Sequence, residues 1–138
     1  MTRGMKVKHH ELEFELDCAW WTEAGMEKFA PLTRAYVAKS SQTDGRSIIE
    51  VPIEDVRAVS RKPGIGIFND NEDSTARERV VRILGGFVSG EKIRPVEVKC
   101  EPPESPYRYK LHDGTHRFYC SLAAGFSHVP AVIKALDQ

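Results

Sequence analysis

Several features are scarce in this chain of 138 residues. The three cysteines, Cys18, Cys100 and Cys120, are odd in number and have no CxxC spacing, which argues against structural disulfides and a zinc site and favours a reducing cytoplasm. No apolar run approaches the roughly 20 residues that span a bilayer, and the first ten residues contain no apolar signal core. We therefore expect a cytoplasmic protein with no membrane contact.

The chain also lacks an excess of charge of either sign, because 20 basic residues balance 20 acidic ones. A protein that coats nucleic acid normally has a basic excess, so net charge does not support nucleic acid as a partner, although a local basic patch stays possible. Acidic residues lie among Arg77, Arg79 and Arg82, which favours a solvated helix face there. A content of 41% hydrophobic and 29% charged residues is typical of a globular domain.

Residues 1–47 are expected to form an N-terminal extension, with a strand and a short helix, that packs on the main domain. Residues 11–18 alternate apolar and acidic side chains, which indicates a half-buried strand, and residues 22–29 suit a short helix. Trp20 and Trp21 are interpreted as core anchors, with stacking on bases or sugars as the alternative. His9 and His10 are expected at the exposed end of a strand, and a metal site there lacks further ligands at suitable spacing.

Residues 48–138 have the pattern of an α+β domain with a mixed sheet and a few packed helices. Alternation predicts strands at residues 95–100 and 107–111. A short strand from residue 47 that runs into a turn at Pro52 and a final strand at residues 129–133 are also expected. A helix is expected from residue 74 or 75 to Gly90, with Val80, Val81, Leu84 and Val88 on its inward face. A second helix is expected from residue 115 or 116 to about residue 124, ended by Gly125, with a buried side formed by Phe118, Tyr119, Leu122, Ala123 and Phe126.

The turn before the second helix has the residue types of an anion site. The first turn of a helix has unpaired N–H groups and a positive dipole end, and Gly114 has no side chain to block a phosphate oxygen. Thr115 adds a hydroxyl, His116 a proton carrier, and Arg117 a fork for bidentate phosphate contact. Asp113 would bind Mg²⁺ or hold His116 in place. The alternative is structural: Asp113 caps the helix and Arg117 pairs with a surface acid.

Residues 48–134 resemble the ParB/sulfiredoxin superfamily. The resemblance rests on Ile-Ile-Glu-Val-Pro-Ile-Glu-Asp-Val from residue 48, on Asp-Gly-Thr-His-Arg at residues 113–117, and on Gly125 followed by Val129-Pro130-Ala131. It implies a single compact nucleotide-binding domain, with ATP, ADP or CTP and Mg²⁺ at the 113–117 turn. Arg61 is a further candidate that would reach the phosphates from the first loop.

The branches of this superfamily differ in activity. ParB partition proteins bind and hydrolyse CTP with the help of downstream regions, and since this chain ends at Gln138 we expect no partition function. Sulfiredoxins have a cysteine in the matching turn, where this chain has Thr115, which argues against their sulfur chemistry; Cys120 is expected in the core. Free-serine kinases have a similar Asp-Gly-His-His-Arg turn, and Glu54 and Asp55 lie in the region that provides their base.

Two hypotheses follow for function. The first is a Mg²⁺-dependent phosphotransferase or phosphohydrolase in which Asp113 and His116 act on metal and proton while Gly114, Thr115, His116, Arg117 and Arg61 hold phosphates. The second is a non-catalytic binding or regulatory module of the same fold, with nucleic acid association as one version of it. In that case residues 1–47 could cover an open sheet edge or form the interface of a homodimer.

Overall fold

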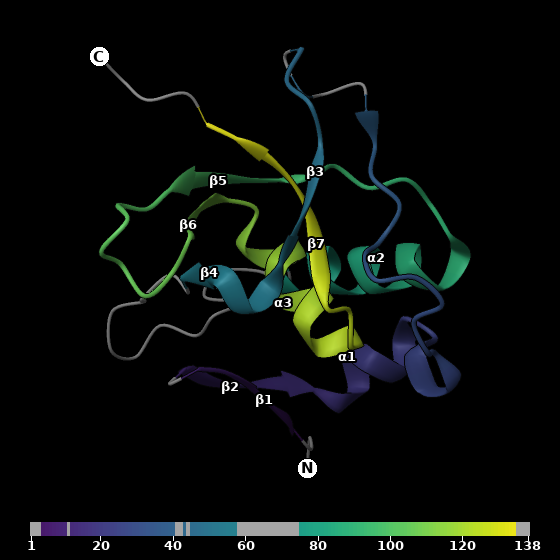
Figure 1. Cartoon of the computed structure of the whole chain (residues 1–138). Helices are drawn as coiled ribbons and strands as arrows, with labels where there is room; N and C mark the ends of the chain where they lie inside the picture. The colour runs from purple at the N-terminus through teal and green to yellow at the C-terminus, as the bar shows by residue number, and fades with distance from the viewer. Residues whose placement is uncertain (1–3, 11, 41–42, 44, 58–74, 135–138) are drawn as a thin grey trace.

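The computed structural model describes residues 4–10, 12–40, 43, 45–57 and 75–134 (Figure 1). Its main sheet has the strand order β3-β7-β5-β6-β4. The strands are β3 (Ile49–Pro52), β4 (Val56–Arg57), β5 (Val96–Cys100), β6 (Tyr109–Asp113) and β7 (His128–Ile133). The β3-β7 and β5-β6 pairs are antiparallel, whereas β5-β7 and β4-β6 are parallel. The predicted α+β class with a mixed sheet is confirmed.

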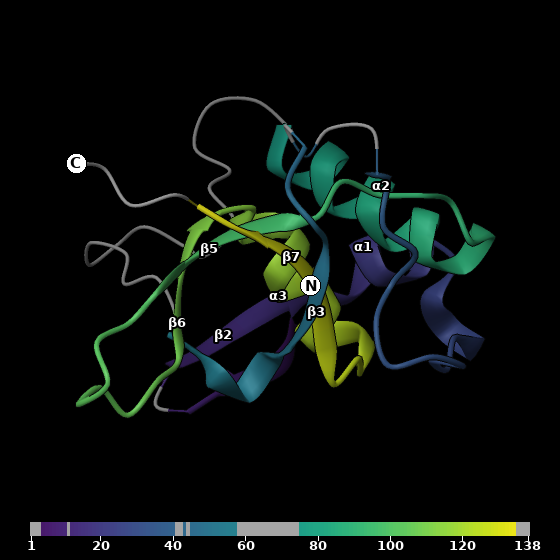
Figure 2. The ribbon, with the colours of Figure 1, turned by 45° about the horizontal axis from the view of Figure 1, so that its top comes forward.

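The N-terminal residues form a separate hairpin. Strand β1 (Gly4–His9) pairs antiparallel with β2 (Leu12–Asp17). Helix α3 (Thr115–Ala124) lies between this hairpin and the five-stranded sheet in Figure 1. Helix α2 (Thr75–Ser89) packs beside α3, and Figure 2 shows the two helices from a second direction. Strands therefore cover α3 from two sides.

This position explains why α3 is buried on more than one face. Phe118, Tyr119 and Cys120 are all fully buried although they are consecutive. Two residues predicted for the buried side, Leu122 and Ala123, are only half-buried. A one-sided helical pattern underestimates the burial of α3, because a helix between two layers has little solvent-facing surface.

The hairpin contributes to the same core as the main sheet. Phe14 and Leu16 of β2 belong to one cluster of buried residues together with Phe118 of α3. His9 was expected to be exposed, but it is buried, and its Nε2 lies 2.7 Å from the backbone oxygen of Val56 at the edge strand β4. The expectation was wrong because the end of β1 packs against β4 and the ring of Phe118, at a centroid distance of 5.4 Å.

The first helix begins earlier than expected. Helix α1 spans Cys18–Glu23, and the side chain of Asp17 caps it by accepting a hydrogen bond from the N–H of Ala19 at 2.8 Å. A 3₁₀ turn follows at Met26–Lys28, after Gly25 in the left-handed region at φ +83°. The predicted helix at 22–29 is therefore misplaced. Trp20 and Trp21 are half-buried in α1 and pack against the core, as a structural role requires.

Helix α2 ends as predicted, with Gly90 in the left-handed conformation at φ +74°. Val80 and Leu84 are fully buried, but Val88 is 47% exposed, and Phe87 is buried in its place. The inward face turns by one residue near the end of the helix, where α2 packs on Tyr36 and Phe126 rather than on α3. No helix in the described part of the chain is long and apolar enough to cross a membrane.

Candidate anion site at the turn between β6 and α3

The predicted turn joins the end of β6 to the start of α3. Gly114 is the N-cap residue and has φ +98°, a left-handed value that glycine adopts without strain. No side chain caps this helix by a hydrogen bond, so the capping part of the structural alternative is wrong. Its other part, the pairing of Arg117 with a surface acid, is present, and the acid is Asp113. The first intrahelical hydrogen bond runs from the N–H of Phe118 to the oxygen of Gly114, at 2.8 Å. The amides of the first turn precede this bond and point out of the N-terminal end of α3.

Gly114 also lies against neighbouring side chains. A Cβ atom at this position would be 2.9 Å from Cγ1 of Val96 and 3.0 Å from Nη2 of Arg117. Both distances are shorter than ordinary van der Waals contact. The residue must therefore be glycine for local packing as well as for its φ value, a reason that the sequence analysis did not include.

Arg117 is more buried than we expect of a guanidinium group that faces solvent and binds phosphate there. Its side chain is 15% exposed, and Nη1 donates to the backbone oxygens of Pro95 at 3.0 Å and Arg94 at 3.2 Å. Nη2 lies 3.7 Å from Oδ2 of Asp113. Burial lowers the pKa of Arg117, and nearby Tyr36 and Asp113 oppose this shift. Arg117 thus ties the start of α3 to the segment before β5, and Nη2 is its nitrogen nearest the turn.

The turn forms one wall of a pocket of about 440 Å³, and α2 forms the other. Arg79 and Arg82 of α2 are exposed side chains, and neither guanidinium has a hydrogen-bond or ion-pair partner among the described residues. Sequence analysis treated these two arginines as part of a solvated face and missed their place opposite the turn. The signal was their spacing of three residues, which puts both on one side of α2. The described residues that line the pocket are Arg79, Arg82, Ile83, Asp113, Gly114, Thr115, His116 and Arg117.

Five of the predicted site residues, at positions 113–117, line this pocket. The side chain of Asp113 is 58% exposed, and Thr115 and His116 are half-buried. In the described residues there is no group of three or more His, Cys, Asp or Glu side chains that could hold a metal ion. A Mg²⁺ ion at Asp113 would therefore take most of its oxygen ligands from water and from a bound phosphate, which is how Mg²⁺ is commonly held.

The sequence also singled out Arg61, Glu54, Asp55 and Cys120. Arg61 is outside the described residues. Glu54 and Asp55 belong to a 3₁₀ turn before β4 and are not among the described residues that line the pocket. The backbone oxygen of Glu54 lies 2.7 Å from Nε2 of His10. Cys120 is fully buried, as expected, and burial raises the pKa of its thiol, which opposes thiolate chemistry.

Comparison with known proteins gives two likenesses of fold. No family model and no curated protein matches the chain. The structure is similar to sulfiredoxin from Arabidopsis thaliana, with a TM-score of 0.44 and 18% identity, over 65% of this chain and 86% of that chain. It is also similar to the C-terminally truncated chromosome-partitioning protein ParB from Caulobacter crescentus complexed with CTP-gamma-S, with a TM-score of 0.42 and 23% identity, over 67% of this chain.

The chain covers 46% of that ParB chain. Sulfiredoxin and ParB are the two protein groups named in the predicted resemblance of residues 48–134. At these TM-scores and identities, the likeness says nothing about activity. The case for a ligand must come from the residues of the pocket.

Proposed function

We propose that this protein binds the phosphate groups of a nucleotide in the pocket between α2 and the turn at residues 113–117. The observation that carries the proposal is the position of Arg79 and Arg82, two exposed guanidinium groups that face the N-terminal end of α3 across this pocket. Guanidinium forks and the amides of a first helical turn are the groups that bind phosphate oxygens in proteins. The turn was proposed from the sequence, and Arg79 and Arg82 on the opposite wall add positive charge to that of Arg117, which Asp113 offsets within the turn.

The charge of the pocket suits an anion with more than one negative charge. Among the described residues, three arginines and one acid, Asp113, line it, so this part of the lining is positive even with His116 neutral. A volume of about 440 Å³ is within the range of small-molecule sites. Because Arg117 already donates to two backbone oxygens, we assign most of the direct phosphate contact to Arg79, Arg82 and the helix amides.

A thermal-shift series tests this proposal. ATP, ADP, CTP, GTP and inorganic tripolyphosphate are added with and without Mg²⁺. A ligand at one hundred times its Kd stabilises the native state by about 2.7 kcal/mol. We expect such a shift for the wild type and its loss in the Arg79→Gln, Arg82→Gln double variant. If no phosphate compound raises the Tm, the proposal is wrong.

Arg77→Gln is the matched control. It removes from the same helix the charge that each of the two pocket substitutions removes, but Arg77 pairs with Glu23 of α1 and is not among the described residues that line the pocket. We expect its ligand shift to equal that of the wild type. An equal loss in the control and in the double variant would mean that the shift reflects overall charge rather than this pocket.

Catalysis is the second candidate function. Asp113 and His116 line the same pocket as the arginines, so an acid and an imidazole would flank a bound phosphate. This arrangement supports a phosphotransferase or phosphohydrolase in which arginines neutralise charge and Asp113 contributes to Mg²⁺ binding. Turnover that requires Mg²⁺ and is lost in Asp113→Asn, with the tripolyphosphate shift retained, would favour it. Nucleotide binding without turnover over a broad panel of acceptors would favour a non-catalytic binding module instead.

A further inference from the structure

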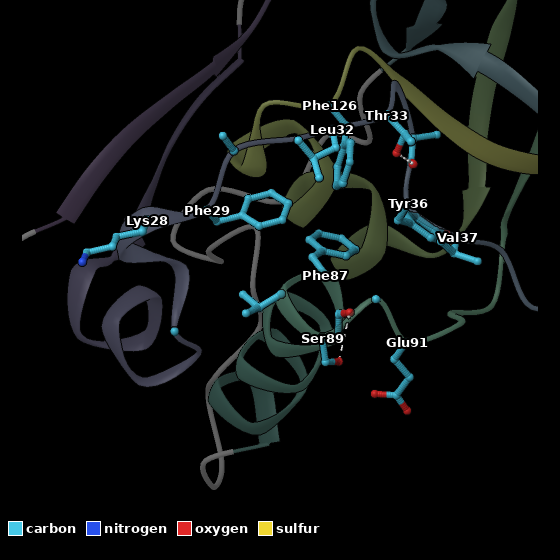
Figure 3. A pocket seen from close by; sticks show the side chains of 16 residues that line it. Lys28, Phe29, Leu32, Thr33, Tyr36, Val37, Phe87, Ser89, Glu91 and Phe126 are labelled. Atoms are coloured by element: carbon cyan, nitrogen blue, oxygen red, sulfur yellow. Dashed lines mark hydrogen bonds between the residues drawn. The ribbon is translucent and has the colours of Figure 1, made fainter.

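A second pocket, of about 510 Å³, lies at the other end of α2, away from the proposed phosphate site. It is formed between the segment from Gly25 to Val37, the end of α2, and Phe126 (Figure 3). Aromatic rings make up its floor: Phe87 contacts Phe126 edge-on at a centroid distance of 5.2 Å and stacks on Tyr36 at 5.5 Å. Phe29 meets Phe126 at 5.9 Å. The lining is therefore more apolar than polar.

The side-chain hydroxyl groups of this pocket are already used within the chain. Thr33 Oγ1 donates to the oxygen of Ala35 at 2.8 Å, Ser89 Oγ donates to the oxygen of Gly86 at 3.3 Å, and Tyr36 Oη donates to the oxygen of Arg94 at 2.7 Å. Sites for small metabolites usually present a few polar groups that orient the ligand. Because their protons are used in this way, these hydroxyls have none to donate to a ligand, which favours an apolar protein side chain as the occupant.

Exposed apolar side chains gather at the same place. Four large hydrophobic residues are exposed in the described part of the chain, and three of them, Leu32, Val37 and Val88, line this pocket. Leu32 is 99% exposed and projects beside the rings of Phe29 and Phe126 (Figure 3). One surface thus has both a protruding apolar side chain and an apolar hollow that could receive one.

Two side chains of opposite charge flank this surface. Lys28 and Glu91, both exposed, lie at opposite ends of the pocket and point away from its apolar centre (Figure 3). A two-fold rotation about the centre would bring Lys28 of one copy toward Glu91 of the other, and the reverse. The same patch would then be complementary to itself in shape, in apolar character and in charge.

We infer that this surface, which we call the aromatic patch (Phe29, Leu32, Tyr36, Val37, Phe87, Val88 and Phe126), binds a second copy of the chain about a two-fold axis. Leu32 of each copy enters the pocket of the other, and Lys28 and Glu91 form two equivalent pairs at the rim. This inference does not depend on the proposed phosphate site, since the patch shares no residue with that pocket.

Sedimentation equilibrium of the full chain tests the inference over about a hundredfold range of concentration, because a dimer dissociates by mass action on dilution. We expect a change from monomer to dimer mass in the wild type. Leu32→Asp should weaken association at least about tenfold, as for a central residue of an interface. Ile133→Asp is the control, because Ile133 is an exposed apolar residue of β7 outside the patch. At a concentration where the chain is monomeric, Leu32→Asp should unfold at the wild-type temperature, because Leu32 is exposed.

A charge exchange tests the two-fold geometry. Lys28→Glu places two acids opposite each other, and Glu91→Lys places two bases opposite each other, so each variant alone should associate about threefold to tenfold more weakly. An equimolar mixture restores both pairs and should form a heterodimer. The matched control is a mixture of Lys110→Glu and Glu104→Lys, both at exposed positions off the patch, which makes the same changes in net charge.

Three results would overturn the inference: a monomer at every concentration, a dimer that tolerates Leu32→Asp, or a mixture of the Lys28 and Glu91 variants that associates no better than its control. The first result would leave a different protein as the partner of the patch. The second would put the interface between copies elsewhere. The third would exclude the two-fold pairing even if the patch is buried in a dimer.

Discussion

Replacement of Gly114 by alanine should destabilise the fold more than the same change at another left-handed glycine. A left-handed backbone costs a residue with a Cβ about 1–2 kcal/mol. At Gly114 the new Cβ would also lie 2.9 Å from Cγ1 of Val96, which is fully buried in β5 and has little room to move. Overpacking of this kind costs about 1–3 kcal/mol. We expect Gly114→Ala to lose about 2–5 kcal/mol of unfolding free energy.

Gly90→Ala is the reference for the backbone contribution. Gly90 has φ +74°, and no atom lies within 4 Å of the position of its Cβ, so only strain should count there. Both variants lower the entropy of the unfolded chain equally, and this effect cancels in their difference. The difference in unfolding free energy, measured by urea titration at a dilute concentration with unchanged m-value, therefore reports the contact with Val96.

Val96→Ala completes a double-mutant cycle. It destabilises the fold by itself, because it removes buried methyl groups. In the double variant the alanine Cβ no longer meets Cγ1 of residue 96, so the loss should be smaller than the sum of the two single losses. Additive losses, together with a Gly114→Ala value no larger than that of Gly90→Ala, would refute the claim that close packing on β5 fixes the turn.

Three further predictions concern the rest of the fold. Burial lowers the pKa of His9 below its ordinary value of 6.5, so the unfolded chain binds a proton more readily than the folded one. The unfolding free energy, measured by urea titration, should therefore be at its full value above pH 6.5 and should fall as the pH drops from 6.5 toward the lowered pKa. His9→Asn should flatten this part of the dependence of unfolding free energy on pH. A thiol reagent should label exposed Cys100 at once but buried Cys120 only on unfolding, and Cys100→Ser should remove the fast phase. Leu16→Ala should cost about 2–5 kcal/mol in a single unfolding transition, because Leu16 is fully buried in the shared core; two separate transitions would show that the hairpin folds independently.

The strands were the most predictable part of this protein. Alternation places a strand wherever one face is buried and the other is wet, and it located β2, β5 and β6 within a few residues. Strand β7 was predicted without alternation, and it has four consecutive buried residues. The partner strand β1 has the same alternation, from Met5 to Lys8, but only its end was predicted. Burial of His9 there depends on contacts with Val56 and Phe118, which are distant in sequence, so a local pattern could not indicate it.

The candidate site was half predictable, for a similar reason. The turn at residues 113–117 is a continuous segment whose residue types indicate an anion site by themselves. Arg79 and Arg82 face that turn only because α2 packs beside α3 in the folded chain. In sequence they are ordinary members of a charged helix face, and their acidic neighbours supported that interpretation. The long-range packing of two helices is the information that a single segment does not contain.

Helix α2 supports both proposed surfaces, and its length keeps them independent. Arg79 and Arg82 lie in its first half, whereas Phe87 and Val88 lie near its end. With a rise of 1.5 Å per residue, Arg79 and Val88 are about 14 Å apart along the axis, farther than the range over which substitutions usually interact. Arg79→Gln should therefore leave association unchanged, and Leu32→Asp should leave the tripolyphosphate shift unchanged. If either variant impairs both properties while its stability is normal, binding and association are linked through α2, and each ligand must then change the affinity for the other by the same factor.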